Sequence, residues 1–321
     1  MAWLTWRQHR SNAAFLGAML LVLGVAVIYL SIAGAGLLAE VRSCNAALGA
    51  CGAMQTWFNS DMQEWWQLLL MAVVVTPVLI GMSVGAPLIP RELEGGTHLL
   101  AWSQGVPRRR WFLIRAALLV VGAALAAAVL AAIAQGWFAM QRDLVGGGAV
   151  LTIWSGFDIA PPVVIAYTVF AVALGIAAGA ALRRTQAAMA VTLGGYIVVR
   201  VSIAVLARWR YLSPVVFHQL AGGQLTASPP APGPGDWWLS TSVWFDAAGH
   251  PLNAVSVSKL ISPCTGNTQA TCPRALQGVY ALVQYQPGSR FWLFQGIEAA
   301  IFVLLAAGLL ALAHRLVLRI R

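Results

Sequence analysis

Three short patterns in the sequence use residue types that catalysis or ligand binding requires. Gly81-Met82-Ser83-Val84-Gly85 matches the G-x-S-x-G pattern of serine hydrolases. Lys259 is the only lysine, so it is the one residue that could act as the phosphate-binding lysine of a P-loop. Four cysteines form two closely spaced pairs, a feature of both zinc sites and disulfides. The residues around each pattern decide between chemistry and structure.

The G-x-S-x-G pattern lies inside a long apolar run. Its chemistry needs a strand-to-helix turn with a histidine and an acid nearby, and the run has no obvious candidate for either at that depth. Glycines spaced by four residues also let membrane helices pack closely, and Gly175 and Gly179 repeat this spacing. We therefore expect helix packing here and no hydrolase site.

Nucleotide and metal sites are also not expected in this chain. A P-loop lysine follows a glycine-rich turn, whereas Lys259 ends the alternation Val255-Ser256-Val257-Ser258-Lys259. The histidines lack the spacing of metal ligands; they are His9, His98, His218, His250 and His314. The chain is thus expected to hold no cofactor and to be no enzyme by itself.

The composition identifies lipid as the solvent for most of the chain. Hydrophobic residues make up 60% and charged residues 9%, and the mean hydropathy is +0.76. A soluble domain has about 25% charged residues. The net charge of +10 comes from arginines at the ends of apolar runs, which indicates membrane topology and argues against nucleic acid as a partner.

Six apolar runs reach the length of about 20 residues that a helix needs to cross the hydrocarbon core. The sequence therefore predicts an all-α integral membrane protein with six transmembrane helices. Residues 1–207 hold helices one to five, 208–290 form an extramembrane segment, and 291–321 hold helix six and a tail. The runs are Ala13–Leu38, Trp66–Ile89, Trp111–Ala134, Pro162–Leu182, Gln186–Ala207 and Phe291–His314.

Basic residues give the orientation of these spans. Seven basic residues fall on one side, spread over about three times as many loop residues as the other side has. The positive-inside rule therefore places both termini in the cytoplasm, in a multi-pass protein of the cell membrane. Residues 3–10 are either an amphipathic interfacial helix or a simple flank of span one. The cytoplasmic side has twelve arginines: Arg7, Arg10, Arg91, Arg108, Arg109, Arg110, Arg115, Arg183, Arg184, Arg315, Arg319 and Arg321.

The cysteines all fall on the predicted outer side, where disulfides persist. Cys44 and Cys51 follow span one, and Cys264 and Cys272 precede span six. Zinc is the alternative, but the spacings fit metal motifs poorly and no histidine is close in sequence to either pair. Of the three possible pairings, two local disulfides, Cys44–Cys51 and Cys264–Cys272, are the simplest.

Residues 208–290 are expected to form a small disulfide-stapled cap between helices five and six. Trp237–Phe245 is predicted to be one strand and Asn253–Val257 a second, shorter one, with a turn at Ala248-Gly249-His250-Pro251 between them. Gly278–Gln284 is a strand or a membrane-hugging helix.

Arg200 and Glu298 are charges well inside the predicted spans, and such residues are functional candidates by default. At 1.5 Å per residue, both lie about 10 Å below the outer edge. Equal depth favours a buried ion pair between them, provided that spans five and six are neighbours. A purely structural pair is the reading that we prefer.

The cytoplasmic segment 90–110 between spans two and three resembles a known motif. Glu92, Glu94, Gly96 and Thr97 match the E-x-E-x-G-T-like coupling segment in membrane subunits of ABC-2 type exporters. Val106-Pro107-Arg108 resembles the turn that follows it. Further stretches resemble a subgroup common in actinobacteria: Trp3–Arg10, Ala180–Thr185, Tyr285–Pro287, Ser289–Trp292, Phe294–Gln295 and Ile297–Glu298.

The resemblance implies a transporter of two membrane subunits, as a homodimer or heterodimer, with two ATP-binding cassette subunits. ATP and Mg would bind to those partners, and the substrate would be amphipathic or hydrophobic. A non-transporting anchor or sensor would not need a coupling segment, and an intramembrane enzyme would need polar groups clustered at one depth. The residues implied in coupling are Glu92, Glu94, Gly96, Thr97, His98, Arg108, Arg109 and Arg110.

Overall fold

A computed structural model describes residues 70–94, 107–144, 153–220, 235–239, 243–253 and 279–319, together with 17, 21–22, 24–26, 28–29, 32, 64, 67–68 and 256. The chain divides into two compact units. The helical unit comprises Met1–Gly148, Gly156–Ile203 and Gln295–Arg321, and the sheet unit comprises Ala149–Ser155 and Ala204–Phe294.

Five described helices are long and apolar enough to cross a membrane, so the chain is a membrane protein. They coincide with five of the six predicted spans. The remaining one, Ala13–Leu38, lies mostly outside the described residues, although its described positions from Gly17 to Ile32 are helical. The five are Leu70–Glu94, Arg109–Ala139, Pro161–Leu182, Thr185–Arg210 and Gly288–Leu318.

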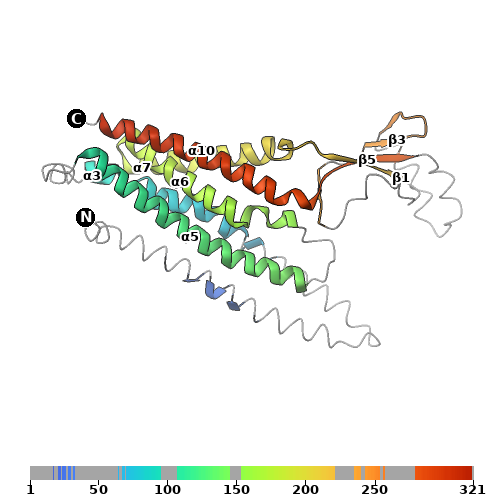
Figure 1. Cartoon of the computed structure of the whole chain (residues 1–321), viewed down its shortest axis with the longest axis horizontal. Helices are drawn as coiled ribbons and strands as arrows, with labels where there is room; N and C mark the ends of the chain where they lie inside the picture. The colour runs from blue at the N-terminus through green and yellow to red at the C-terminus, as the bar shows by residue number, and fades with distance from the viewer. Residues whose placement is uncertain are drawn as a thin grey trace. The chain divides into compact units, whose positions relative to one another are not determined.

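Figure 1 shows these helices by label and colour. The first ends in a π-helical turn, η2 (Gly81–Gly85), and a short helix, α3 (Pro90–Glu94). The next three are α5 (Arg108–Leu144), α6 (Pro161–Leu182) and α7 (Thr185–Ser202), and the last is α10 (Phe291–Leu318). A 3-10 helix, η3 (Ile153–Ile159), precedes α6, and η4 (Ile203–Ala207) and η5 (Arg208–Arg210) follow α7.

Helix α6 is the buried centre of the helical unit. In its apolar window 83% is buried, against 28% or less in α5, α7 and α10, and it packs on α5, α7 and η2. A helix that is apolar all round suits such a position. Proline at its first turn starts α6, and Arg183, with a left-handed φ of 56°, ends it by donating its N–H to the carbonyl of Gly179.

The glycines of η2 and α6 let the two backbones touch. A Cβ on Gly175 would lie 2.6 Å from the carbonyl oxygen of Gly81, and one on Gly81 would lie 2.6 Å from that of Ala171. Gly85 and Gly179 are equally close to backbone oxygens of the facing segment. Ser83 donates its hydroxyl to the carbonyl of Leu79. The predicted helix packing at the G-x-S-x-G pattern is therefore confirmed.

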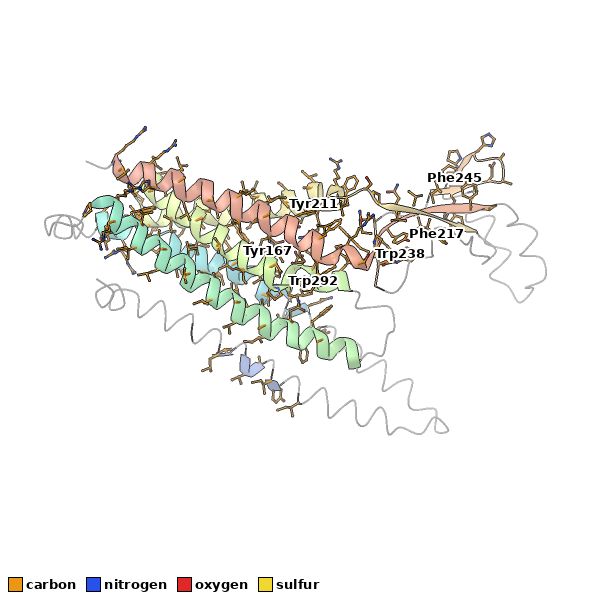
Figure 2. All side chains as sticks on the ribbon, viewed as in Figure 1. Tyr167, Tyr211, Phe217, Trp238, Phe245 and Trp292 are labelled. Carbon is orange, nitrogen blue, oxygen red and sulfur yellow. The ribbon has the colours of Figure 1, made fainter. Side chains whose placement is uncertain are left out.

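The sheet unit contains a five-stranded antiparallel sheet, so the all-α class was too narrow and the fold is mostly helical. Its strands are β1 (Val215–Leu220), β2 (Trp237–Trp238), β3 (Val243–Phe245), β4 (Pro251–Leu252) and β5 (Tyr280–Gln286). The order is β1-β5-β3-β4, and β2 also pairs with β5. Phe217 of β1 and Phe245 of β3 are labelled in Figure 2.

The strands correct the predicted boundaries. Trp237–Phe245 is not one strand: Trp238 lies opposite Tyr285 and Val243 opposite Leu282, so five steps on one chain match three on β5. The register therefore shifts by two residues between β2 and β3. Of the two alternatives for Gly278–Gln284, the described part is a strand, since β5 covers Tyr280–Gln286. The predicted turn is confirmed, with Gly249 at a φ of 84°.

Several predicted site residues lie outside the described part of the chain. They include all four cysteines of the predicted disulfides, Cys44, Cys51, Cys264 and Cys272, and part of the coupling segment, Gly96, Thr97 and His98. The predicted strand near Asn253–Val257 also falls mostly there, and the strand that is described, β4, ends just before Asn253.

Candidate functional site

The short helix α3 carries two carboxylates that bind two different spans. Glu92 is buried, at 8% exposure, and forms an ion pair with Arg115 of α5. The guanidinium of Arg115 also lies 4.8 Å from the ring centre of Trp111, one turn earlier on α5. A buried ion pair is stable only when each charge has its partner, so Glu92 and Arg115 hold α3 against α5.

Glu94 faces the other way and is exposed. One of its oxygens accepts a hydrogen bond from the backbone N–H of Thr185, at 3.0 Å, and the other accepts one from the Thr185 hydroxyl, at 2.9 Å. Thr185 is the first residue of α7, whose own N-cap, Arg184, makes no side-chain capping bond. Glu94 therefore supplies the acceptor and the negative charge that a helix N-terminus favours.

Helix α3 also packs against the end of α6. A Cβ added to Gly179 would lie 2.9 Å from the ring of Pro90, the first residue of α3. Five residues of chain thus contact α5, α6 and α7. We call Pro90, Glu92, Glu94, Arg115 and Thr185 the α3 junction. Any displacement of α3 would act on all three helices.

The remaining described coupling residues lie at the surface near this junction. Arg109 and Arg110 are exposed in the first turn of α5, while the side chain of Arg108 is outside the described part. Exposed arginines mark the same end of the helical unit in other elements, at Arg91, Arg183, Arg184 and Arg315. We call this the arginine-rich end. The sequence pattern predicted these arginines as a group.

A second polar cluster lies near the start of α6, and sequence reasoning identified only two of its members. Tyr167 of α6 is labelled in Figure 2 and is 1% exposed. Its hydroxyl donates a hydrogen bond to Glu298 of α10, which is also 1% exposed. The guanidinium of Arg200, on α7, lies 4.2 Å from the centre of the Tyr167 ring and 3.3 Å from Asp158 of η3.

Arg200 and Glu298 therefore both contact Tyr167. Arg200 lies 3.3 Å from the carboxylate of Asp158, and a direct ion pair between Arg200 and Glu298 stays a prediction. Sequence reasoning missed Asp158 and Tyr167. The signal for Asp158 was an acid between Phe157 and Ile159, inside an apolar stretch that leads into a span.

We call Asp158, Tyr167, Arg200 and Glu298 the tyrosine cluster. Two further contacts stabilise it. Gln295 of α10 donates its side-chain amide to the carbonyl of Phe157 at 2.8 Å. The ring of Phe302, one turn beyond Glu298, packs edge-on against Tyr167 with centres 4.6 Å apart. The cluster thereby joins η3, α6, α7 and α10. No three His, Cys, Asp or Glu residues of the described chain are placed to hold a metal ion.

A family model described as "ABC-2 membrane transporter related" matches residues 17–208, which is more than half of the chain. The chain belongs to the ABC-2 membrane transporter related family. No curated protein matches the sequence. The resemblance of the coupling segment to ABC-2 proteins is thereby confirmed at the level of the family, and the actinobacterial subgroup stays a prediction.

In this ABC-2 family protein, the family match includes the whole α3 junction and most of the tyrosine cluster. It ends at Arg208, before β1 and the rest of the sheet, and before Glu298. The two sites lie at opposite ends of α6. Tyr167 and Leu182, the last residue of α6, are separated by about 22 Å of helix at 1.5 Å per residue. Helix α6 therefore connects the two sites.

Proposed function

We propose that this chain is the membrane-spanning subunit of an ATP-driven exporter. It moves an amphipathic or hydrophobic substrate outward with energy from a separate ATP-binding cassette subunit, which binds ATP and Mg. The α3 junction is the observation that carries this proposal. A transporter driven by a partner subunit needs a segment that passes the partner's movement to the transmembrane helices. Helix α3 contacts three of these helices, α5, α6 and α7.

The residues of the α3 junction and the exposed coupling residues have different roles in this proposal. Glu94, Arg109 and Arg110 are exposed and form the contact with the ATPase, together with Gly96, Thr97, His98 and Arg108. Glu92 acts inside the chain, because a buried carboxylate bound to Arg115 is not accessible to a partner. The pair passes a displacement of α3 to α5, and Glu94 passes it to α7 through Thr185.

The topology part of the proposal has six spans, with both termini in the cytoplasm. The arginine-rich end then faces the ATPase, as the positive-inside rule requires. Two such chains, identical or related, assemble with two ATPases in the cell membrane. Cys44–Cys51 and Cys264–Cys272 form disulfides on the outer side; four free thiols in mass spectra of unreduced, alkylated protein would reject them.

Charge reversal at Glu94 tests the coupling role. In the complex assembled with its ATPase, Glu94→Lys should lower substrate-stimulated ATP hydrolysis at least severalfold, while the ATPase still co-purifies. The matched control is Glu64→Lys, which reverses an exposed glutamate just before the span that ends in α3. If substrate-stimulated ATP hydrolysis is unchanged in a correctly assembled Glu94→Lys complex, Glu94 is not part of the contact with the ATPase. Failure to bind any ATPase would count against the exporter itself.

A further inference from the structure

A groove runs between α5 and α10 at the arginine-rich end, and it shares Arg109 with the ATPase contact proposed above. It has a volume of about 440 Å3, within the range of small-ligand sites. Its lining residues recur on one face of each helix, at three- and four-residue steps. They are Arg109, Phe112, Leu113, Ala116, Ala117 and Val120 of α5, and Leu310, Ala311 and His314 of α10.

The groove has polar groups at one end only. Arg109 is exposed at the first turn of α5. His314 lies one turn before the end of α10, and its ring is 5.8 Å from that of Phe112. The Nε2 atom of His314 is buried and has no hydrogen-bond partner in the described part of the chain. A buried polar atom of this kind favours a ligand that can satisfy it.

The rest of the groove is lined by apolar side chains. Ala116, Ala117 and Ala311 provide the hollow, because larger side chains would fill it. From Arg109 to Val120 the groove follows about 16 Å of helix. Leu113 forms part of its wall and is 48% exposed, so it would face hydrocarbon in a membrane. The shape therefore fits one extended acyl chain that enters from the lipid.

We propose that this groove binds an anionic phospholipid from the leaflet at the arginine-rich end. The headgroup phosphate contacts Arg109 and His314, and one acyl chain lies along Ala116, Ala117 and Val120. The charge supports this ligand: the lining residues include an arginine and a histidine and no carboxylate. Basic pockets between membrane helices are a known mode of anionic lipid recognition.

A second copy of this chain is the competing occupant. A protein helix that fills the groove would also have to place a carboxylate against Arg109, because burying an unpaired charge is costly. A phospholipid supplies both the negative charge and the apolar chain. The two occupants predict different effects of the same variants, so one experiment separates them.

The test uses native mass spectrometry of the purified full chain with phosphatidylglycerol or phosphatidylcholine. The wild type should retain phosphatidylglycerol and little phosphatidylcholine. Arg109→Gln should retain phosphatidylglycerol about fivefold less, the effect of one arginine at an anionic lipid surface. Ala117→Phe, which fills the groove, should lose it altogether. Ala311→Phe fills the groove from the opposite wall and replaces Ala117→Phe if that variant does not fold.

Two controls change the same residue types away from the groove. Arg110→Gln removes the neighbouring exposed arginine, and Ala300→Phe enlarges an exposed alanine of α10. Both should retain phosphatidylglycerol like the wild type. Equal retention of the two lipids by the wild type, or equal losses in Arg109→Gln and Arg110→Gln, would overturn the proposal. So would a groove-filling variant that dissociates a dimer and keeps its lipid, because the groove would then be an interface between copies.

Discussion

Glu94 caps α7 through both of its carboxylate oxygens, although Glu94 and Thr185 are 91 residues apart in the chain. Helix caps are usually supplied by the residue just before the helix. Here Arg184 occupies that position without a side-chain capping bond. The start of α7 is therefore stabilised by a different span, and a change in α3 alters α7 directly.

Removing the Glu94 carboxylate should loosen the first turn of α7. In Glu94→Ala the N–H of Thr185 loses its acceptor, so hydrogen exchange at the first α7 amides should accelerate. Thr185→Val should have a smaller effect, since it removes only the hydroxyl bond and leaves the N–H bond in place. Exchange measured by mass spectrometry in detergent separates the two. Equal exchange in Glu94→Ala and wild type would show that the cap is not formed in solution.

Replacing only one partner of the ion pair between Glu92 and Arg115 should lower the free energy of unfolding more than replacing both partners does. Glu92→Leu or Arg115→Leu alone leaves one buried charge without its partner, which typically costs about 3–5 kcal/mol. The double variant removes both charges and should be more stable than the sum of the two single losses predicts. Unfolding in denaturing detergent gives the four free energies of this cycle. Strictly additive losses would mean that the two side chains act independently.

The hydroxyl of Tyr167 should matter for stability, while that of Tyr196 should not. Tyr167→Phe deprives the buried carboxylate of Glu298 of a hydrogen bond, a loss of about 1–3 kcal/mol. Tyr196 is the matched control, because it is buried on α7 and its hydroxyl has no partner in the described chain. Tyr196→Phe should therefore leave the free energy of unfolding almost unchanged. Similar losses in both variants would argue against a specific role for Tyr167.

A second double-mutant cycle identifies the electrostatic partner of Arg200. Coupling between Arg200→Leu and Asp158→Asn is expected from the 3.3 Å contact. Coupling between Arg200→Leu and Glu298→Leu would confirm the direct pair that equal depth predicted. If the second cycle is additive and the first is not, Arg200 is bound by Asp158 and Glu298 by Tyr167.

The sequence predicted the depth of these residues better than their contacts. Counting along each span placed Arg200 and Glu298 near one level, and the structure brings both to Tyr167. Depth follows from helix rise alone. The identity of a partner depends on which helices pack together and how each is rotated. Those are properties of side-chain packing between distant segments, so Asp158 and Tyr167 had no local signal that linked them to Arg200.

The sheet shows the same limit in another form. The apolar stretch Trp237–Phe245 predicted one strand where the structure has β2 and β3, and Gly278–Gln284 left a strand and a helix open. The two-residue shift between β2 and β3 could not be read from these stretches, because it is defined only by pairing with β5. Strand β1 was missed altogether. Val215–Leu220 begins with three residues that favour strands, Val215, Val216 and Phe217, but it is short and lies only a few residues after the end of span five.

The turn from Asp246 to His250 should lose order in acid. The N–H of His250, hydrogen-bonded to the carboxylate, holds the pKa of Asp246 below its usual 3.8, with help from the His250 ring and the N–H of Ala248. A depressed pKa gives stability that is present above 3.8 and lost as the pH falls through the lower, folded value. Exchange protection of the Ala248 and His250 amides should fall in that range.

The amide of Gly249 is the internal control for this turn. It bonds to the backbone carbonyl of Asp246 and not to the carboxylate, so its protection should change less with pH. Asp246→Asn should abolish the pH dependence at Ala248 and His250. Parallel loss of protection at all three amides in the wild type would indicate unfolding of the whole sheet and not titration of Asp246.

Adding a single methyl group at Gly175 should destabilise the protein more than adding one at Gly308. A Cβ at Gly175 would lie 2.6 Å from the carbonyl oxygen of Gly81 and 2.7 Å from the backbone nitrogen of Ala86, so two backbones would have to separate. Overpacking of this kind typically costs about 1–3 kcal/mol. Gly308→Ala is the control, because a Cβ there meets no atom within 4 Å, and alanine favours a helix by about 1 kcal/mol over glycine. Gly175→Ala should therefore lower the melting temperature in detergent, and Gly308→Ala should keep or raise it. Equal stability of the two variants would mean that η2 and α6 are not in backbone contact.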